Sequence, residues 1–212
     1  MENKLQPSEP GALQENTQAA TFNLPGDGNT LVAHTDAVYN SFNMVLLNGN
    51  SSLDGDLGTT VEINPNYYNL IVVGDASLVP NGCVFIKKDE AITQSTTVEI
   101  KETYASLSPE AIAKVKTFPA LIATKNHYYN KTDAEHKAIY GVITGIEVQD
   151  NGIKVSYQML NPVPQQRLNE LVQELSIENA PCCNELDNTH WAIKHTNLIK
   201  VLQDAGVQIL HY

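Results

Sequence analysis

The chain has 212 residues, of which 42% are hydrophobic and 17% are charged, and its formal net charge at pH 7 is −11. No stretch approaches the roughly 18 apolar residues that a membrane helix requires, so the sequence excludes a helical membrane span. A phosphate-binding surface needs clustered Lys and Arg, and residues 5–86 contain neither, so we expect no nucleic-acid binding through this half.

Residues 1–20 are rich in Gln, Glu, Ser, Pro and Asn, and this composition predicts a mobile tail. Residues 21–105 predict a β-rich domain, because apolar runs alternate with clusters of Gly, Asn, Asp and Pro. The continuous apolar run at residues 70–73 is typical of a strand buried on both faces. No sustained helical period occurs in this half, and the candidate strands are 30–34, 43–47, 59–63, 67–73, 82–87 and 96–100.

Residues 106–212 predict an α+β domain, and the junction at 104–109 is the expected boundary. Ser108-Pro109-Glu110 is a helix start, because Ser caps orphan amides and Pro suits the first helical position. The helix is expected to end at Phe118-Pro119, followed by a strand at 119–124. A capping box at 132–135 predicts one short helical turn. Whether the two halves form separate domains or one continuous core stays open.

Residues 138–160 predict a β-hairpin, because Asn151-Gly152 is the residue pair that a type I′ turn favours. A two-residue loop there would pair Val148 with Val155 and Ile146 with Tyr157 and place these apolar side chains on one face. The glycines at 141 and 145 permit a bulge, so we expect a curled antiparallel sheet.

Two helices are predicted after the hairpin. The first begins at Pro164 and carries the apolar stripe Leu168, Leu171, Val172 and Leu175, which we expect to cover the hairpin. A strand at 189–195 would place Trp191, Ile193 and His195 on one face, with His195 a core histidine. Thr196 is the expected cap of the second helix, Gly206 its end and 207–212 a terminal strand. The fold class is therefore α+β, with a β-rich N-terminal part and a C-terminal curled antiparallel sheet covered by two or three helices.

The residues predict neither a metal site nor a cofactor. Cys182 and Cys183 are adjacent, whereas structural zinc needs a spacing such as C-x2-C. Asp54-Gly55-Asp56 lacks the Glu of a calcium loop, and the glycine-rich phosphate loop and the Gly-x-Ser-x-Gly elbow are absent. A cysteine nucleophile at 182 or 183 with His190 as base is one reading, and two small residues packed in a loop is the other.

The cluster most typical of a site is the loop that holds His127, Tyr128, Tyr129 and His136. It combines aromatic faces, imidazoles and the start of a helical turn, all of which suit ligand binding. The alternative is that the tyrosines only wedge the loop onto the core.

We expect a non-enzymatic, acidic binding module that recognises a protein or a small ligand. The charge is uneven, with a net of −9 for residues 1–102 and −2 for residues 103–212, and it serves either solubility or the steering of a basic partner. An enzyme of unfamiliar type with a site near 127–136 and a structural subunit of a larger assembly are the alternatives. The three cysteines and the lack of a visible signal peptide predict a cytoplasmic setting with a protein partner, without nucleic acid or membrane, and leave the oligomeric state open.

Overall fold

The computed structural model describes residues 20–23, 30–35, 42–46, 59–74, 77–92, 95–180 and 182–209, with side chains described from Ile63 onwards. Apart from Ala20, the predicted tail lies outside these residues. Of the helices in the described ranges, none has the length and apolar character that crossing a membrane would require.

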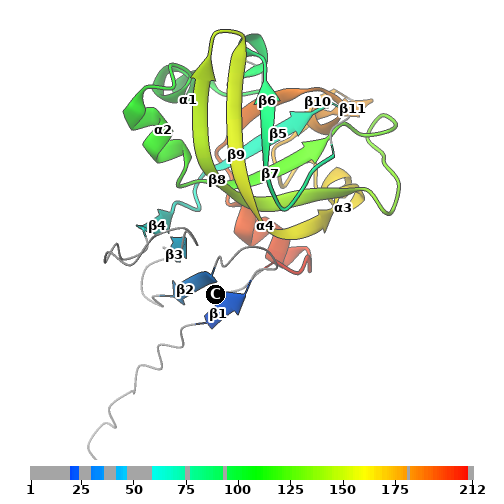
Figure 1. Cartoon of the computed structure of the whole chain (residues 1–212). Helices are drawn as coiled ribbons and strands as arrows, with labels where there is room; N and C mark the ends of the chain where they lie inside the picture. Colours follow the sequence, from blue (N-terminus) through cyan, green and yellow to red (C-terminus); the bar gives the residue numbers. More distant parts are fainter. Residues whose placement is uncertain are drawn as a thin grey trace, which may run out of the picture.

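The main body is a six-stranded mixed sheet in the order β12-β5-β7-β8-β9-β6 (Figure 1). β5 and β7 are parallel and the other neighbours are antiparallel. Strands from both sides of residues 104–109 therefore share one sheet. The bounds are β5 Tyr68–Val73, β6 Asn81–Ile86, β7 Pro119–Thr124, β8 Lys137–Gln149, β9 Gly152–Pro164 and β12 His190–Lys194.

Two smaller sheets complete the strands of the described residues. The antiparallel four-stranded sheet of β1 (Ala20–Asn23), β2 (Thr30–Thr35), β3 (Phe42–Leu46) and β4 (Thr59–Ile63) contains the predicted strands at 30–34, 43–47 and 59–63, while β1 was not predicted. The two-stranded sheet pairs β10 (Glu178–Ala180) with β11 (Cys183–Asn184). The fold is thus α+β and rich in strands.

The four α-helices in the described part are α1 (Val98–Tyr104), α2 (Pro109–Val115), α3 (Gln165–Glu170) and α4 (Leu198–Asp204), and η1 (Lys88–Glu90) and η2 (Glu185–Asp187) are short 3-10 helices. Ser108 caps α2 as predicted, since its hydroxyl accepts a hydrogen bond from the amide of Ala111 at 3.2 Å. α4 is instead capped by Asn197 rather than Thr196.

The strand predicted at residues 96–100 is wrong, because α1 begins at Val98. Val98, Glu99 and Ile100 alternate like a strand in sequence. In the structure Ile100 and Tyr104, four residues apart, bury one helical face, and Val98 is 64% exposed. The terminal strand was also not found in the described residues, because 207–209 form no strand after Gly206, which ends α4 with a φ of 70° as predicted.

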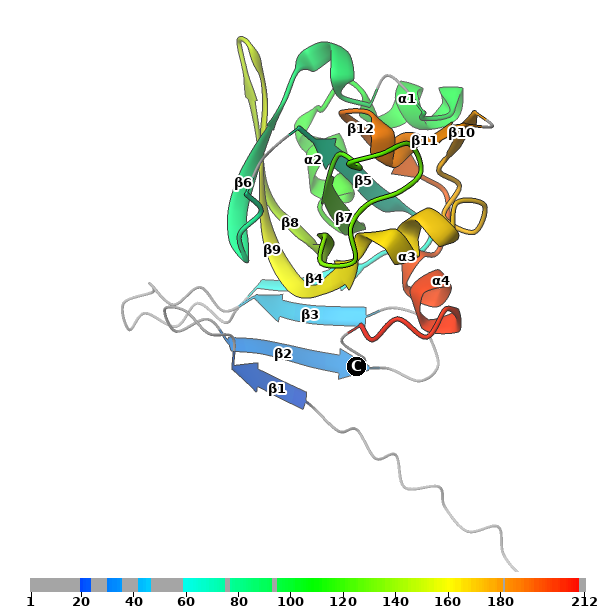
Figure 2. The ribbon, with the colours of Figure 1, turned by 90° about the vertical axis from the view of Figure 1, so that its right-hand side faces the viewer.

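The sheet separates two hydrophobic cores. Leu70 and Val72 of β5 face the core that α3 and α4 cover, and Ile71 and Val73 face the core that α1 and α2 cover. Every residue of β5 is buried, which confirms the prediction of a strand buried on both faces. Figure 2 shows the β8–β9 ribbon curving beside these helices, with α1 and α2 above α3 and α4.

The predicted hairpin is present, but its turn and register differ from the prediction. The strands pair Gln149 with Gly152 and Val148 with Ile153, so Asp150 and Asn151 form the turn. The register is displaced by two residues at the tip, which keeps the predicted apolar residues on one face. Bulges at Tyr140/Gly141 and Ile143/Gly145 agree with the expected curling.

Gly152 is required by packing against the neighbouring strand and not by the turn. A Cβ atom on Gly152 would lie 2.3 Å from Cζ of Phe85 and 2.6 Å from the carbonyl oxygen of Ile86. Gly152 also lacks the positive φ of a type I′ turn, since Gly206 is the glycine of the described chain that has one. The contact with β6 therefore explains the glycine at this position.

Three of the four residues in the predicted apolar stripe are buried and Val172 is partly buried, but the stripe covers the opposite side of the sheet. Leu168, Leu171 and Leu175 belong to the core with Leu160 and Val163 at the base of the ribbon. The tip residues Ile146, Val155 and Tyr157 pack in the α1–α2 core instead. α3 ends at Glu170 and the chain continues in turns, so the stripe extends beyond the helix.

Candidate functional site

The candidate site is the connection from β7 to β8, residues 125–136, which projects at the right of Figure 1. All four residues that the sequence predicts for the site, His127, Tyr128, Tyr129 and His136, lie in this connection. Two of them, the histidines, are in contact with each other. The two tyrosines extend into solvent.

The histidines belong to a chain of hydrogen bonds between a carboxylate and a hydroxyl. Asp133 Oδ2 contacts Nδ1 of His127. Nε2 of His127 lies 3.1 Å from Nδ1 of His136, and Nε2 of His136 lies 2.7 Å from Oγ1 of Thr124. With both rings neutral, Nδ1–H of His127 donates to Asp133, Nδ1–H of His136 donates to Nε2 of His127, and the Thr124 hydroxyl donates to Nε2 of His136. In this arrangement all four imidazole nitrogens have a hydrogen-bond partner.

Burial of the His136 ring lowers its pKa, and the neighbouring His127 lowers it further, while Asp133 acts in the opposite direction. The neutral imidazole is therefore the favoured form at neutral pH. The two rings meet edge to face at a centroid distance of 4.6 Å. No helix forms at the capping box of residues 132–135, where the chain makes a single turn closed by the amide of His136 and the carbonyl of Asp133 at 3.0 Å.

The tyrosines are presented at the tip of the loop. Tyr128 is 70% exposed and Tyr129 is 77% exposed. Tyr128 and Lys131 exchange two backbone hydrogen bonds of 3.0 Å each, and Asn130 between them has a φ of 57°, so the tip is a closed turn. The alternative that the tyrosines wedge the loop onto the core is wrong, because the core does not cover them.

A buried polar network holds the loop from beneath. The side-chain amides of Asn126 and Asn169 bond each other reciprocally at 2.9 and 3.0 Å. Asn126 also donates to Oδ1 of Asp187 at 2.8 Å, and the same oxygen accepts the backbone N–H of Asn130 at 3.1 Å. The residues of this network come from three separate segments of the chain. They are Asn126, then Gln165 and Asn169, then Asn184 and Asp187.

A second buried polar group lies on β12 and η2. Glu185 accepts a hydrogen bond from Lys194 Nζ at 2.5 Å and contacts Nε2 of His190 at 3.1 Å, and all three residues are buried. Nδ1 of His190 lies 2.9 Å from the carbonyl oxygen of Asn188. Both imidazole nitrogens are thus engaged inside the protein, which argues against His190 as a base for Cys182 or Cys183.

His195 was predicted to be a core histidine, and this is wrong. The residue is exposed and stacks on Tyr67 at a ring centroid distance of 4.8 Å and an interplanar angle of 20°. β12 ends at Lys194, so the chain has left the sheet at this position. His195 is therefore a surface residue packed on an aromatic ring.

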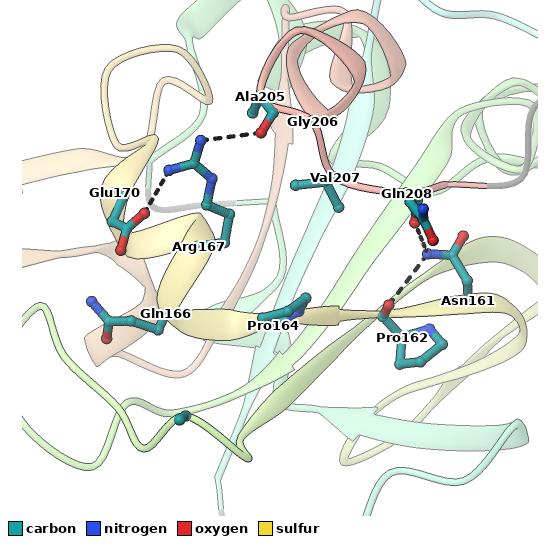
Figure 3. Close-up of a pocket in the computed structure, with 11 residues that line it drawn as sticks. Asn161, Pro162, Pro164, Gln166, Arg167, Glu170, Ala205, Gly206, Val207 and Gln208 are labelled. Carbon is teal, nitrogen blue, oxygen red and sulfur yellow. Dashed lines mark hydrogen bonds and ion pairs between the residues drawn. The ribbon is translucent and has the colours of Figure 1, made fainter.

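A groove of about 740 Å³ lies next to the loop, between the end of β9, α3 and the segment after α4 (Figure 3). Ala134 of the loop forms part of its wall, and the adjacent Gln166 accepts the backbone N–H of Thr132 at 3.0 Å. Arg167 pairs with Glu170 at 2.6 Å. The loop and the groove thus share a wall, and the groove's arginine already has a carboxylate partner.

Among the described residues, no group of three or more His, Cys, Asp and Glu is placed to hold a metal ion. Comparison of the chain with protein-family models, with curated proteins and with solved structures gave no match. The site is therefore interpreted from its own geometry.

Sequence reasoning missed the residues that support the loop, above all Asn126 and Asp187. One signal was present, because Asn184 and Asp187 form a capping box: Asn184 accepts the amide of Leu186 at 2.8 Å, and Asp187 accepts that of Asn184 at 2.8 Å. Nothing in the sequence relates this box to a loop more than fifty residues earlier, since Asn126 and Asp187 are 61 positions apart.

Proposed function

We propose that this protein is a non-enzymatic binding module that recognises a partner protein through the loop of residues 125–136. One observation carries the proposal: Tyr128 and Tyr129 are 70% and 77% exposed on a loop that is fixed at its tip and its base. Exposed apolar groups that lie together inside a polar rim are typical of interaction sites. Tyrosine is also among the residues that contribute most to protein interfaces.

The support beneath the loop strengthens the proposal, because a fixed loop loses less conformational entropy on binding than a flexible one. Asp187 fixes the amide of Asn130 and the side chain of Asn126, and the Tyr128–Lys131 turn closes the tip. The tyrosine rings are thus presented in advance of binding. Little of the binding energy is then lost to ordering the loop.

The test compares two double variants of the full chain. We expect Tyr128→Ser/Tyr129→Ser to lose the proteins that the wild type captures from native lysate, with a fall in affinity of about thirtyfold or more, on the order of 2 kcal/mol or above for aromatic anchors. The matched control is Val98→Ser/Val148→Ser, which removes apolar side chains of 64% and 53% exposure elsewhere. Equal capture by both variants would contradict the proposal, and so would a wild type that captures nothing.

An enzyme is the second candidate, and the chain Asp133–His127–His136–Thr124 is the observation that favours it. A carboxylate, an oriented imidazole and a hydroxyl within hydrogen-bond reach are the parts that nucleophilic catalysis uses. Here His136 would accept the Thr124 proton. Turnover of small ester or amide substrates that disappears in His127→Ala and His136→Ala would support it. The absence of any turnover in the wild type leaves binding as the function.

We also propose a cytoplasmic, reduced setting and no nucleic-acid partner. The supporting features are the three cysteines, which the structure describes as free thiols at Cys83, Cys182 and Cys183, and the net charge of −11. Thiol titration of protein taken directly from cells should give three reactive groups after denaturation. Fewer groups would argue for an oxidising compartment.

A further inference from the structure

We propose that the tyrosine loop binds an acidic segment of its partner protein, an inference that rests on the function proposed above. Three lysines surround the loop: Lys125 directly after β7, Lys131 in the tip and Lys137 at the start of β8. All three side chains are exposed. β7 and β8 are antiparallel neighbours, so Lys125 and Lys137 lie at the same end of the sheet, and Lys131 pairs with Tyr128.

These three lysines differ from most other cations of the described chain. None of the three forms an ion pair within the part of the chain that the structure describes. Five cations elsewhere do form one, namely Lys87, Lys154, Arg167, Lys194 and Lys200. Lys88, Lys101, Lys114 and Lys116 also form no ion pair in the described ranges, so the distinction of the three loop lysines is their position beside two exposed tyrosines.

The carboxylates near the loop form no ion pair with these lysines within the described ranges. Asp133 contacts His127, and Asp187 accepts hydrogen bonds from Asn126, Asn130 and Asn184. Asp133 and Glu135 are the two exposed carboxylates of the loop, against the three ammonium groups of Lys125, Lys131 and Lys137. Two exposed aromatic faces framed by free cations fit a ligand that combines negative charge with apolar side chains.

An acidic peptide segment fits this surface better than nucleic acid does. The chain as a whole carries a net charge of −11, which repels a long polyanion. A short acidic segment meets mainly the local charges, because charges on the surface are screened beyond about 8 Å at physiological salt. Its aspartates and glutamates face the lysines, and its apolar residues cover the tyrosine rings.

The test measures the fluorescence anisotropy of three labelled ligands with the full chain. They are a 12-residue peptide of Asp, Glu and Leu, the same peptide with Asn and Gln in place of Asp and Glu, and a 12-nucleotide single strand of thymidine. We expect the acidic peptide to bind most tightly and to weaken as salt rises. The variant Lys125→Gln/Lys131→Gln/Lys137→Gln should lower its affinity roughly tenfold, since exposed ion pairs contribute modestly and act together here.

The matched control is Lys88→Gln/Lys101→Gln/Lys114→Gln, which removes three lysines away from the loop that also form no ion pair within the described ranges. It should leave the affinity unchanged within about twofold. Equal weakening by both triple variants, or tighter binding of the oligonucleotide, would overturn the inference.

The same experiment separates this inference from the proposed function. If the neutral peptide binds as well as the acidic one and Tyr128→Ser/Tyr129→Ser abolishes both, the loop is a binding site and only its charge preference is refuted. If the tyrosine variant changes nothing, the function itself fails. The acidic peptide could instead be found to dissociate a dimer of the chain. This result would assign the surface to a second copy of the chain and would overturn the choice of a different partner protein.

Discussion

Among the described residues, Glu185 is a buried carboxylate that accepts a hydrogen bond from Lys194 and contacts His190. Burial lowers the pKa of Lys194, while Glu185 acts in the opposite direction. Burial raises the pKa of Tyr68, and Glu185 raises it further. Removal of the Glu185 carboxylate would leave the buried ammonium group of Lys194 without its ion-pair partner.

Glu185→Gln should destabilise the fold by about 3–5 kcal/mol, because Lys194 would remain buried without its carboxylate. The control Glu147→Gln breaks an exposed pair with Lys154 at 3.2 Å and should cost less than about 1 kcal/mol. Urea unfolding measures both. A Glu185 variant no less stable than the Glu147 variant would show that the buried pair contributes nothing.

The histidine chain predicts a dependence of stability on pH. The pKa of His136 is lowered in the fold relative to about 6.5 in the unfolded chain, so the unfolded state binds the proton more readily. The contribution of the neutral His136 to the free energy of unfolding is therefore complete above about pH 6.5 and decreases as the pH falls below that value. His136→Asn should flatten this decrease in urea unfolding between about pH 7.5 and 5. An unchanged slope would contradict the role assigned to His136.

At the scale of elements, the sequence predicts those whose signal is local. The apolar run of β5, the Ser-Pro-Glu start of α2 and the existence of the hairpin all depend on adjacent residues. The register of the hairpin does not depend on adjacent residues alone, because Gly152 is fixed by contact with Phe85 and Ile86 of β6. His127 and His136 could be predicted as neighbours within one loop, whereas Asp187 comes from a distant segment that only the fold brings beneath it.

Gly152→Ala should destabilise the protein by about 1–3 kcal/mol, since the new methyl group would meet a backbone oxygen at 2.6 Å and force the strands apart. Gly145→Ala is the matched change in the same hairpin, where the nearest atom lies at 3.5 Å, and it should be close to neutral. The variant Gly152→Asn distinguishes a requirement of the turn from a requirement of packing against β6 at this position. Asn suits a positive φ, so a tolerated Asn would favour the turn, and a destabilising one favours the contact with β6.

At the scale of the whole molecule, β5 connects the two halves of the sequence. It lies between β12 and β7, and its side chains enter both hydrophobic cores. β6 likewise precedes residue 105 and pairs with β9. The loop that carries the tyrosines is the direct continuation of β7, so its position depends on this shared sheet.

A fragment of residues 106–212 should therefore fail to fold, because β12 and β7 both lose their neighbour β5. A fragment of residues 63–212 keeps all six strands and should unfold in one cooperative transition. Circular dichroism during thermal unfolding distinguishes them. A cooperative transition in the shorter fragment would contradict the dependence of β7 and β12 on β5.

The central claim is that the fold holds the loop of residues 125–136 in one arrangement that presents Tyr128 and Tyr129. Amide hydrogen exchange in the full chain tests it most directly, because protection reports local opening. The account predicts that the amides of Tyr128, Asn130 and Lys131 are protected, and that Asp187→Ala removes the protection of Asn130 first. Exchange of all three amides at the rate of an unstructured chain in the wild type would contradict it.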